Sequence, residues 1–211
     1  MNKAVFLDLN GTLIPSVTYD EPVSFDLIPG VIEAIAQLAN KGFFCPVVTI
    51  QSRIGKGIFT EKEFLAKFND LAKKMQKHKA YIQGPYVCPH SYGINCHCRK
   101  PSSFLFQKAA QDFKIDLKNS YVIGDSVCDI VSAVKFGGYG CLVKSSEKRF
   151  SKNEINLIAK NSAFIGNSIN EIVDWVIDME TRSLGMISLC KEKTKYGESQ
   201  KSTSNKFFTV T

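Results

Sequence analysis

The sequence predicts an α/β domain built on a doubly wound parallel sheet, with helices on both faces and no large cap domain. Two observations predict this fold class: short apolar runs alternate with stretches of helical periodicity, and glycine or proline turns separate several of them. Alternation at this spacing is typical of βαβ units, whose strands run parallel. A chain of 211 residues is long enough for one such domain and a small appendage.

Five apolar runs are expected to form the strands of this Rossmann-like sheet, at residues 4–9, 43–50, 80–87, 121–124 and 139–143. Helices are expected at residues 31–39, 60–76, 101–113 and 126–136, with a last amphipathic helix at 169–179. The second helix has the clearest start signal, because Thr60 and Glu63 have the spacing of a capping box. Pro101 suits the first turn of the third helix.

The domain is expected to cover residues 1–180, and residues 181–211 are expected to form a polar, flexible tail. Lysine, serine and threonine dominate residues 191–205. A segment of this composition has too few apolar groups to offset the entropy that folding costs.

The charge and cysteine content narrow the class of protein. The formal net charge of +7 suits an anionic ligand and would also suit a nucleic acid. We expect no nucleic-acid partner, because the basic clusters at 73–79, 144–152 and 191–206 lack a recognition-helix or aromatic-basic pattern, and we interpret them as solvated faces.

No apolar run reaches the ~18 residues of a membrane span, and the start of the chain does not resemble a signal peptide. Seven irregularly spaced cysteines indicate a reducing compartment, so we expect a cytoplasmic protein, and a monomer.

Three polar residues, Asp8, Thr49 and Asp125, each lie at or just after the carboxyl end of an expected strand. In doubly wound sheets, ligands bind beyond these ends at a topological switch point. We therefore expect the three side chains to converge on one crevice. Taken singly, each has a simpler explanation, since aspartate caps turns and helices and threonine is a good strand former.

The residues of this crevice suit the binding and transfer of phosphate. Asp8 can attack phosphorus to give an aspartyl-phosphate, and a tight turn at Gly11 lets backbone N–H groups approach a phosphate. Asp125 and Asp129, four residues apart at a strand–helix junction, can hold Mg²⁺. The Arg99-Lys100 pair adds two cations before an expected helix start, an end that already favours anions.

A separate group of metal-binding residue types occupies the loop at residues 88–98. The four candidate ligands are Cys88, His90, Cys96 and Cys98. Three thiols and one imidazole can supply a tetrahedral zinc site, and a site filled entirely by protein would be structural. His97 competes for the fourth position, and we prefer His90 because its Cys-x-His pair mirrors the Cys-x-Cys pair. The remaining cysteines are expected to fill core or surface positions.

Together these motifs resemble the four motifs of the haloacid dehalogenase superfamily, in the same order, over about residues 3–143. The matching segments are Asp8-Leu-Asn-Gly-Thr12, Thr49, Arg99-Lys-Pro101, and Gly124-Asp125 with Asp129. The Cys-Pro-His…Cys-x-Cys-Arg-Lys-Pro segment resembles the zinc-containing branch of that superfamily. This branch holds D-glycero-D-manno-heptose 1,7-bisphosphate phosphatase and the histidinol-phosphate phosphatase domain.

The two enzymes of this branch match different parts of the chain. The loop at residues 47–60 is more similar to the heptose enzyme. The short spacing from His90 to Cys96 and the segment at 120–125 are more similar to the histidinol-phosphate enzyme. We favour the heptose branch, because the 47–60 loop is nearer the substrate.

The resemblance implies a Mg²⁺-dependent phosphomonoester hydrolase of carbohydrate metabolism that acts on a small phosphorylated metabolite. It implies that Asp8 is the nucleophile and that Thr49 and Lys100 stabilise the transferring phosphoryl group. The implied Mg²⁺ ligands are Asp8, the backbone carbonyl of Asn10, and Asp125. The implied substrate contacts are Gln51, Ser52 and Arg99.

Asn10 is the departure from the family pattern with the largest chemical consequence. The family has a second aspartate there, which protonates the leaving alkoxide, and an amide cannot exchange that proton. General acid–base steps contribute about 10²–10⁴-fold, and we therefore expect turnover to be impaired by at least that factor. Because Ile50, Arg53 and Ser126 also depart from the pattern, a non-catalytic descendant that binds a phosphorylated ligand or a partner protein is the second hypothesis. The same departures argue against a variant made to trap a substrate complex, in which a single change would be expected.

Overall fold

The computed structural model describes residues 1–16, 25–145 and 148–183. Residues Met1–Val173 form one compact unit, and a second unit begins at Asp174. Residues 169–183 are helical, so the expected tail boundary at 180 falls inside a helix. The rest of the expected tail, from residue 184 on, lies outside the described residues. Within the described ranges no helix is long and apolar enough to cross a membrane.

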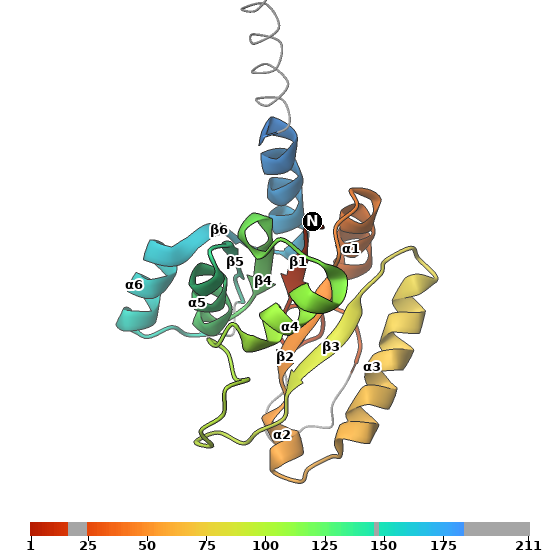
Figure 1. The fold of residues 1–211 in the computed structure, drawn as a ribbon, viewed down its shortest axis with the longest axis vertical. Coiled ribbons are helices and arrows are strands. Elements are labelled where there is room, and N and C mark those ends of the chain that lie inside the picture. Colours follow the sequence, from red (N-terminus) through yellow and green to blue (C-terminus); the bar gives the residue numbers. More distant parts are fainter. Residues whose placement is uncertain (17–24, 146–147, 184–211) are drawn as a thin grey trace, which may run out of the picture. The chain divides into compact units, whose positions relative to one another are not determined.

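Among the described residues, six parallel strands form one sheet in the order β3-β2-β1-β4-β5-β6 (Figure 1). The strands are β1 (Val5–Leu7), β2 (Pro46–Ile50), β3 (Gln83–Cys88), β4 (Tyr121–Gly124), β5 (Tyr139–Val143) and β6 (Ser162–Gly166). This strand order is that of a doubly wound sheet, whose connections reverse direction next to the first strand. The expected fold class is confirmed, and the switch point lies between β1 and β4.

The helices are α1 (Val31–Asn40), α2 (Ser52–Gly55), α3 (Glu61–Gln76), α4 (Phe104–Phe113), α5 (Val127–Phe136) and α6 (Lys152–Asn161), with a short 3₁₀ helix η1 (Leu117–Asn119). The expected capping box opens α3: the Glu63 N–H donates to the Thr60 hydroxyl, and the Thr60 N–H donates to the Glu63 carboxylate. Ser151 and Glu154 form the same box at the start of α6, a helix that we did not predict.

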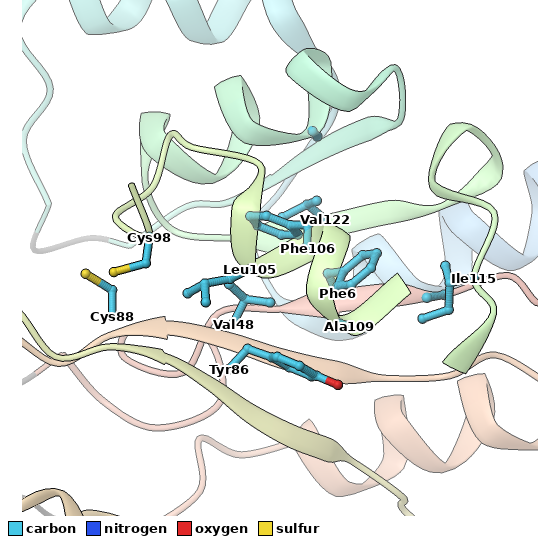
Figure 2. Packing of buried hydrophobic residues seen from close by; sticks show 12 residues of the cluster. Phe6, Val48, Tyr86, Cys88, Cys98, Leu105, Phe106, Ala109, Ile115 and Val122 are labelled. Atoms are coloured by element: carbon cyan, nitrogen blue, oxygen red, sulfur yellow. The ribbon is translucent and has the colours of Figure 1, made fainter. Parts of the chain in front are cut away.

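One large core cluster lies between α4 and the sheet, and Figure 2 shows its side chains. Phe6 of β1 and Val48 of β2 belong to it together with Phe106 of α4. The rings of Phe6 and Phe106 meet edge to face, with centroids 5.2 Å apart, a favoured aromatic geometry. Cys88 and Cys98 lie at one end of the same cluster (Figure 2). The loop with the candidate zinc ligands is therefore anchored to the core at both of its ends.

The opposite face of the sheet is covered as well. Val5 and Leu7 alternate with Phe6 along β1, so they point away from α4, and both are fully buried. Helices α1 and α3 each bury an apolar stripe. Right-handed crossovers place the helices that precede β2 and β3 on the face opposite α4, which accounts for this burial.

The start of α4 differs from the prediction. The helix begins at Phe104, with Ser103 at its N-cap, and the Lys100–Pro101 peptide bond is cis. Pro101 therefore lies outside the first turn, and the Arg99-Lys100 pair stands too far ahead of the helix to act with its N-terminus. The Lys100 side chain is buried and donates to Asp8 at the carboxyl end of β1.

Candidate active site

Three carboxylates meet at the carboxyl ends of β1 and β4, the switch point of the sheet. Asp8 directly follows β1, and its N–H donates to the Ile123 carbonyl of β4 at 2.9 Å. Asp125 directly follows β4, and Asp129 lies in the first turn of α5. Each carboxylate offers an oxygen within 4.8 Å of the others. The structure thus brings Asp8 and Asp125 together as expected, with Asp129 beside them.

Lys100 lies among these carboxylates, with its side chain only 3% exposed. Its Nζ donates to Asp8 Oδ1 at 2.6 Å, to Asp129 Oδ1 at 2.5 Å and to the Val48 carbonyl at 3.0 Å. An ammonium group has three N–H donors, so each of them has an acceptor. Since Val48 precedes Thr49 in β2, this lysine joins the ends of β1 and β2 to the start of α5.

Burial dominates the electrostatics of the site. It raises the pKa of Asp8 to about 7, an effect that Lys100 partly reverses and that Asp129 reinforces. It also raises the pKa of Asp125, and Lys148 opposes that rise. Burial by itself would lower the pKa of Lys100, but the Asp129 and Asp8 carboxylates outweigh it and raise that pKa. The lysine therefore stays charged, and its charge favours the ionised form of Asp8 that a nucleophile requires.

Two glycines leave the space that the carboxylates fill. Gly11 has a φ of +80°, and a Cβ there would lie 2.3 Å from Asp125 Oδ2. A Cβ on Gly124 would lie 2.3 Å from the Cγ of Asp129. Both separations are steric overlaps with buried, ion-paired groups, so neither position can carry a side chain without moving the site.

The turn after Asp8 contains two buried polar atoms without a hydrogen-bond partner in the described part of the chain, Asn10 Oδ1 and Thr12 Oγ1. The turn is closed by the Gly11 N–H, which donates to the Ile14 carbonyl at 2.7 Å. Buried polar atoms almost always have a partner, and exceptions are typical of functional sites that an ion, a water or a ligand completes. Position 10 thus has a buried amide oxygen that such a partner could complete.

Thr49, Gln51 and Ser52 lie at the end of β2 and the start of α2. The Gln51 Nε2 donates to the Thr49 hydroxyl at 3.0 Å, and both residues are buried. The Gln51 N–H donates to the Cys88 carbonyl at 2.8 Å. Ser52 is the first residue of α2. These three candidates therefore connect the carboxyl end of β2 with the loop that follows β3.

The candidate zinc ligands come together in the loop after β3. The Cys88 Sγ lies 3.7 Å from His90 Nδ1 and 3.8 Å from Cys96 Sγ, and His90 Nδ1 lies 3.2 Å from Cys98 Sγ. All four donor atoms lie within 4.8 Å of one another. Two donors on a tetrahedral zinc are about 3.5–3.8 Å apart, given the usual metal–ligand distances. The group therefore has the size and the donor chemistry of a zinc site.

His97 and the core cysteines lie outside this group. The His97 ring meets the Phe104 ring edge to face, with centroids 4.4 Å apart. Cys45 and Cys141 are fully buried, and burial raises the pKa of each thiol to about 12. Thiols in this state are apolar core residues, as expected for these two.

Arg99 holds the loop between the ligands. Its guanidinium donates to the His90 carbonyl and, at 2.9 Å, to the Ser91 carbonyl. It also lies 5.8 Å from the centroid of the Tyr92 ring, within range of a cation–π interaction. These contacts fix the chain next to Lys100, so the loop sets the position from which that lysine reaches Asp8.

Lys148 and Ser126 also contact the carboxylates, and we did not predict these contacts from the sequence. Lys148 Nζ lies 2.8 Å from Asp125 Oδ2, and the Ser126 hydroxyl donates to Asp129 Oδ2 at 2.5 Å. Ser126 stands between the strand and the helix that carry the two aspartates, so its place at the site could have been inferred. Lys148 belongs to a basic cluster that we interpreted as a solvated face, and nothing local distinguishes it.

The chain is similar in sequence to known proteins. Residues 97–172 match the family model described as HAD-hydrolase-like. The D-glycero-beta-D-manno-heptose-1,7-bisphosphate 7-phosphatase of Haemophilus influenzae is 32% identical over 185 residues, which cover 84% of this chain and 92% of that protein. The chain belongs to the heptose bisphosphate phosphatase family.

A second relative supports the assignment to the heptose bisphosphate phosphatase family, and a solved structure shares the fold. The enzyme of the same name from Haemophilus ducreyi is 34% identical over 184 residues, which cover 82% of this chain and 98% of that protein. The D,D-heptose 1,7-bisphosphate phosphatase of B. bronchiseptica, solved with magnesium and phosphate, has a TM-score of 0.71 and 21% identity, covering 84% of this chain and 99% of that one. At that identity the likeness concerns the fold. Both curated relatives lie in the heptose branch that the loop at residues 47–60 favours.

Proposed function

We propose that this chain is a Mg²⁺-dependent phosphatase that acts on a small phosphorylated sugar, of the heptose 1,7-bisphosphate kind, through an aspartyl-phosphate on Asp8. The observation that carries the proposal is the buried group of Asp8, Asp125 and Asp129 around Lys100. A phosphoryl transition state chiefly needs positioning and charge neutralisation, and these carboxylates would hold the Mg²⁺ that neutralises charge, beside the cation of Lys100. The names of the relatives support the substrate class.

The donor set suits magnesium. Mg²⁺ prefers oxygen ligands, and one or two carboxylates completed by a backbone carbonyl, water and phosphate are typical. Asp8, Asp125 and the Asn10 carbonyl would hold it. The three carboxylates are buried, and the side-chain oxygen of Asn10 is buried without a partner. Both observations fit a site that a cation and a ligand complete. When bound, Mg²⁺ would neutralise charge on the phosphoryl oxygens.

The chain's own residues would perform two displacements. In the first, a carboxylate oxygen of Asp8 forms a bond to phosphorus while the bond from phosphorus to the sugar oxygen breaks. Lys100 would favour the ionised nucleophile, and Thr49 and Lys100 would stabilise the transferring group. In the second, water attacks phosphorus and releases phosphate, restoring Asp8. Gln51, Ser52 and Arg99 would position the sugar phosphate around these groups.

Each displacement needs a proton to move, and Asn10 stands where a carboxyl group would carry it. The departing sugar oxygen must gain a proton, and the attacking water must lose one. We therefore propose that turnover is slow, with water substituting for the missing acid. This same feature favours the second candidate function, a descendant that binds the sugar phosphate without hydrolysing it.

Phosphate release from a panel of sugar phosphates tests the function. We expect Mg²⁺-dependent release by the wild type, with the highest kcat/KM for heptose 1,7-bisphosphate over histidinol phosphate. Asp8→Asn should lose at least about 10³-fold, because it removes the nucleophile. Equal release by wild type and Asp8→Asn would refute the assigned nucleophile. Tight sugar-phosphate binding with no release, both in wild type and after Asn10→Asp, would favour the binding descendant.

We also propose that Cys88, His90, Cys96 and Cys98 hold a structural Zn²⁺ that fixes the loop before Lys100. We expect about one zinc per chain by metal analysis, and a loss of thermal stability after Cys98→Ser, because ligation of a structural zinc contributes directly to folding. Cys128→Ser is the matched control, since Cys128 lies outside the ligand group, and it should keep the zinc. Zinc-free wild type whose stability is unchanged by Cys98→Ser would contradict the site.

A further inference from the structure

Two lysines bind the carboxylates of the site, and their environments differ. Lys100 is enclosed, and its three N–H donors are all used by Asp8, Asp129 and a backbone carbonyl. The Lys148 side chain is 35% exposed, and it contacts one carboxylate, Asp125, at 2.8 Å. Lys148 therefore keeps donors that can turn to another acceptor, whereas Lys100 would have to break an ion pair to do so.

The position of Lys148 brings it into competition with a metal ion. Asp125 is a proposed Mg²⁺ ligand, and its Oδ2 lies 2.8 Å from the Lys148 ammonium and close to Gly11. A cation bound directly to a metal ligand weakens metal affinity, because the metal must displace or share that carboxylate. Once a metal neutralises Asp125, the ammonium loses most of its attraction to it.

The charges of the site indicate which group Lys148 would bind after it leaves Asp125. When all three carboxylates are ionised, as attack by Asp8 requires, three carboxylates and two ammonium groups leave one net negative charge on the described cluster, which opposes binding of a phosphate dianion. Mg²⁺ reverses that sign. A phosphoryl group that enters beside Asp125 would bring acceptor oxygens within reach of the Lys148 ammonium, which lies 2.8 Å from Asp125 Oδ2. An ammonium and a phosphate oxygen form a charge-assisted hydrogen bond.

We infer that Lys148 exchanges partners during the reaction cycle, from Asp125 in the metal-free protein to a phosphoryl oxygen in the magnesium-bound one. This inference rests on the proposed function and extends it. Lys148 would be a second cation for the transferring group, and it would make Mg²⁺ and phosphate bind cooperatively. Because linkage is reciprocal, each ligand strengthens the other by the same factor.

Calorimetric titration of Mg²⁺ and of inorganic phosphate, each with and without the other, tests the exchange. In the wild type we expect each ligand to strengthen the other by about 10-fold or more, within the usual range of coupling between sites. Lys148→Met should bind Mg²⁺ alone more tightly, because the competing cation is gone. It should bind phosphate to the magnesium form more weakly, so the coupling shrinks about 10-fold. Lys148→Arg should keep most of the coupling.

Arg149→Met is the matched control: it removes one positive charge from the exposed neighbour of Lys148 and should behave as the wild type does. If Mg²⁺ and phosphate couple equally in wild type and Lys148→Met, the exchange is refuted while the proposed function stands. If the wild type does not bind Mg²⁺ at all, the proposed metal site fails and the exchange fails with it. Unchanged Mg²⁺ affinity in Lys148→Met would also overturn the inference.

Discussion

Replacing Asn10 with aspartate is expected to raise kcat for sugar-phosphate hydrolysis by about 10²–10⁴-fold, the usual contribution of a general acid–base group. The side chain at position 10 has a buried oxygen without a partner, two residues from the nucleophile. A carboxyl group there would be buried in the turn that follows Asp8, and burial raises a carboxyl pKa toward neutrality. Such a group can give a proton to the sugar oxygen and then accept one from water.

The measurement is phosphate release by wild type and Asn10→Asp over a range of pH. Asn40→Asp makes the same chemical change at an exposed position of α1 and should leave kcat unchanged. The double variant Asp8→Asn, Asn10→Asp should be inactive, which shows that the gain passes through the same nucleophile. No gain from Asn10→Asp alone would mean that position 10 does not carry the proton.

Replacing Lys100 with methionine is expected to abolish turnover and to lower the free energy of unfolding by about 3–5 kcal/mol. The side chain is 3% exposed and pairs with two buried carboxylates, and removing one partner of a buried ion pair leaves the other charge uncompensated. Lys108→Met, at an exposed position of α4, removes the same charge and should cost little. Urea unfolding of the three proteins measures the difference.

The loss in Lys100→Met should depend on pH. Burial raises the pKa of Asp8 to about 7 even beside the lysine, and without the lysine it would rise further. A carboxyl with a raised pKa binds protons more tightly in the folded state, so its contribution to stability falls as pH rises from its unfolded pKa toward its folded pKa. We therefore expect a larger destabilisation at about pH 8 than at about pH 5, measured without added magnesium. A loss that is equal at both values would contradict the uncompensated carboxylates as its cause.

The fold could be predicted where a local pattern controls it. The central strands are uniformly apolar because both of their faces are covered, and the Thr60–Glu63 box specifies the start of α3. We did not predict β6, the strand at one side of the sheet, or α6, the helix that precedes it. Ile158 is the buried residue of α6, whereas Ile155 and Leu157 are exposed, and β6 shows half-buried alternation over five residues. The Ser151–Glu154 box was the one available signal there.

The candidate site was predictable to the extent that its residues follow strand ends. Asp8 and Asp125 converge because parallel strands end at one edge of the sheet. The ion pairs of Lys100 and Lys148 could not be predicted from the positions of the strand ends, because each lysine contacts a carboxylate far from it in sequence. The same applies to α4, whose start is delayed to Phe104 while the chain carries Lys100 to Asp8.

The ion pairs of the site join residues that are 92, 29 and 23 positions apart. Contacts of such separation form late in folding, because the entropy of closing the intervening chain must be offset before they form. On the ribosome, Asp8 emerges before its partner Lys100, and Asp125 emerges before its partner Lys148. During refolding, activity should therefore recover only when the half of the sheet with β1, β2 and β3 has packed against the half with β4, β5 and β6. Helices and strands detected by their secondary-structure signals can form before that step.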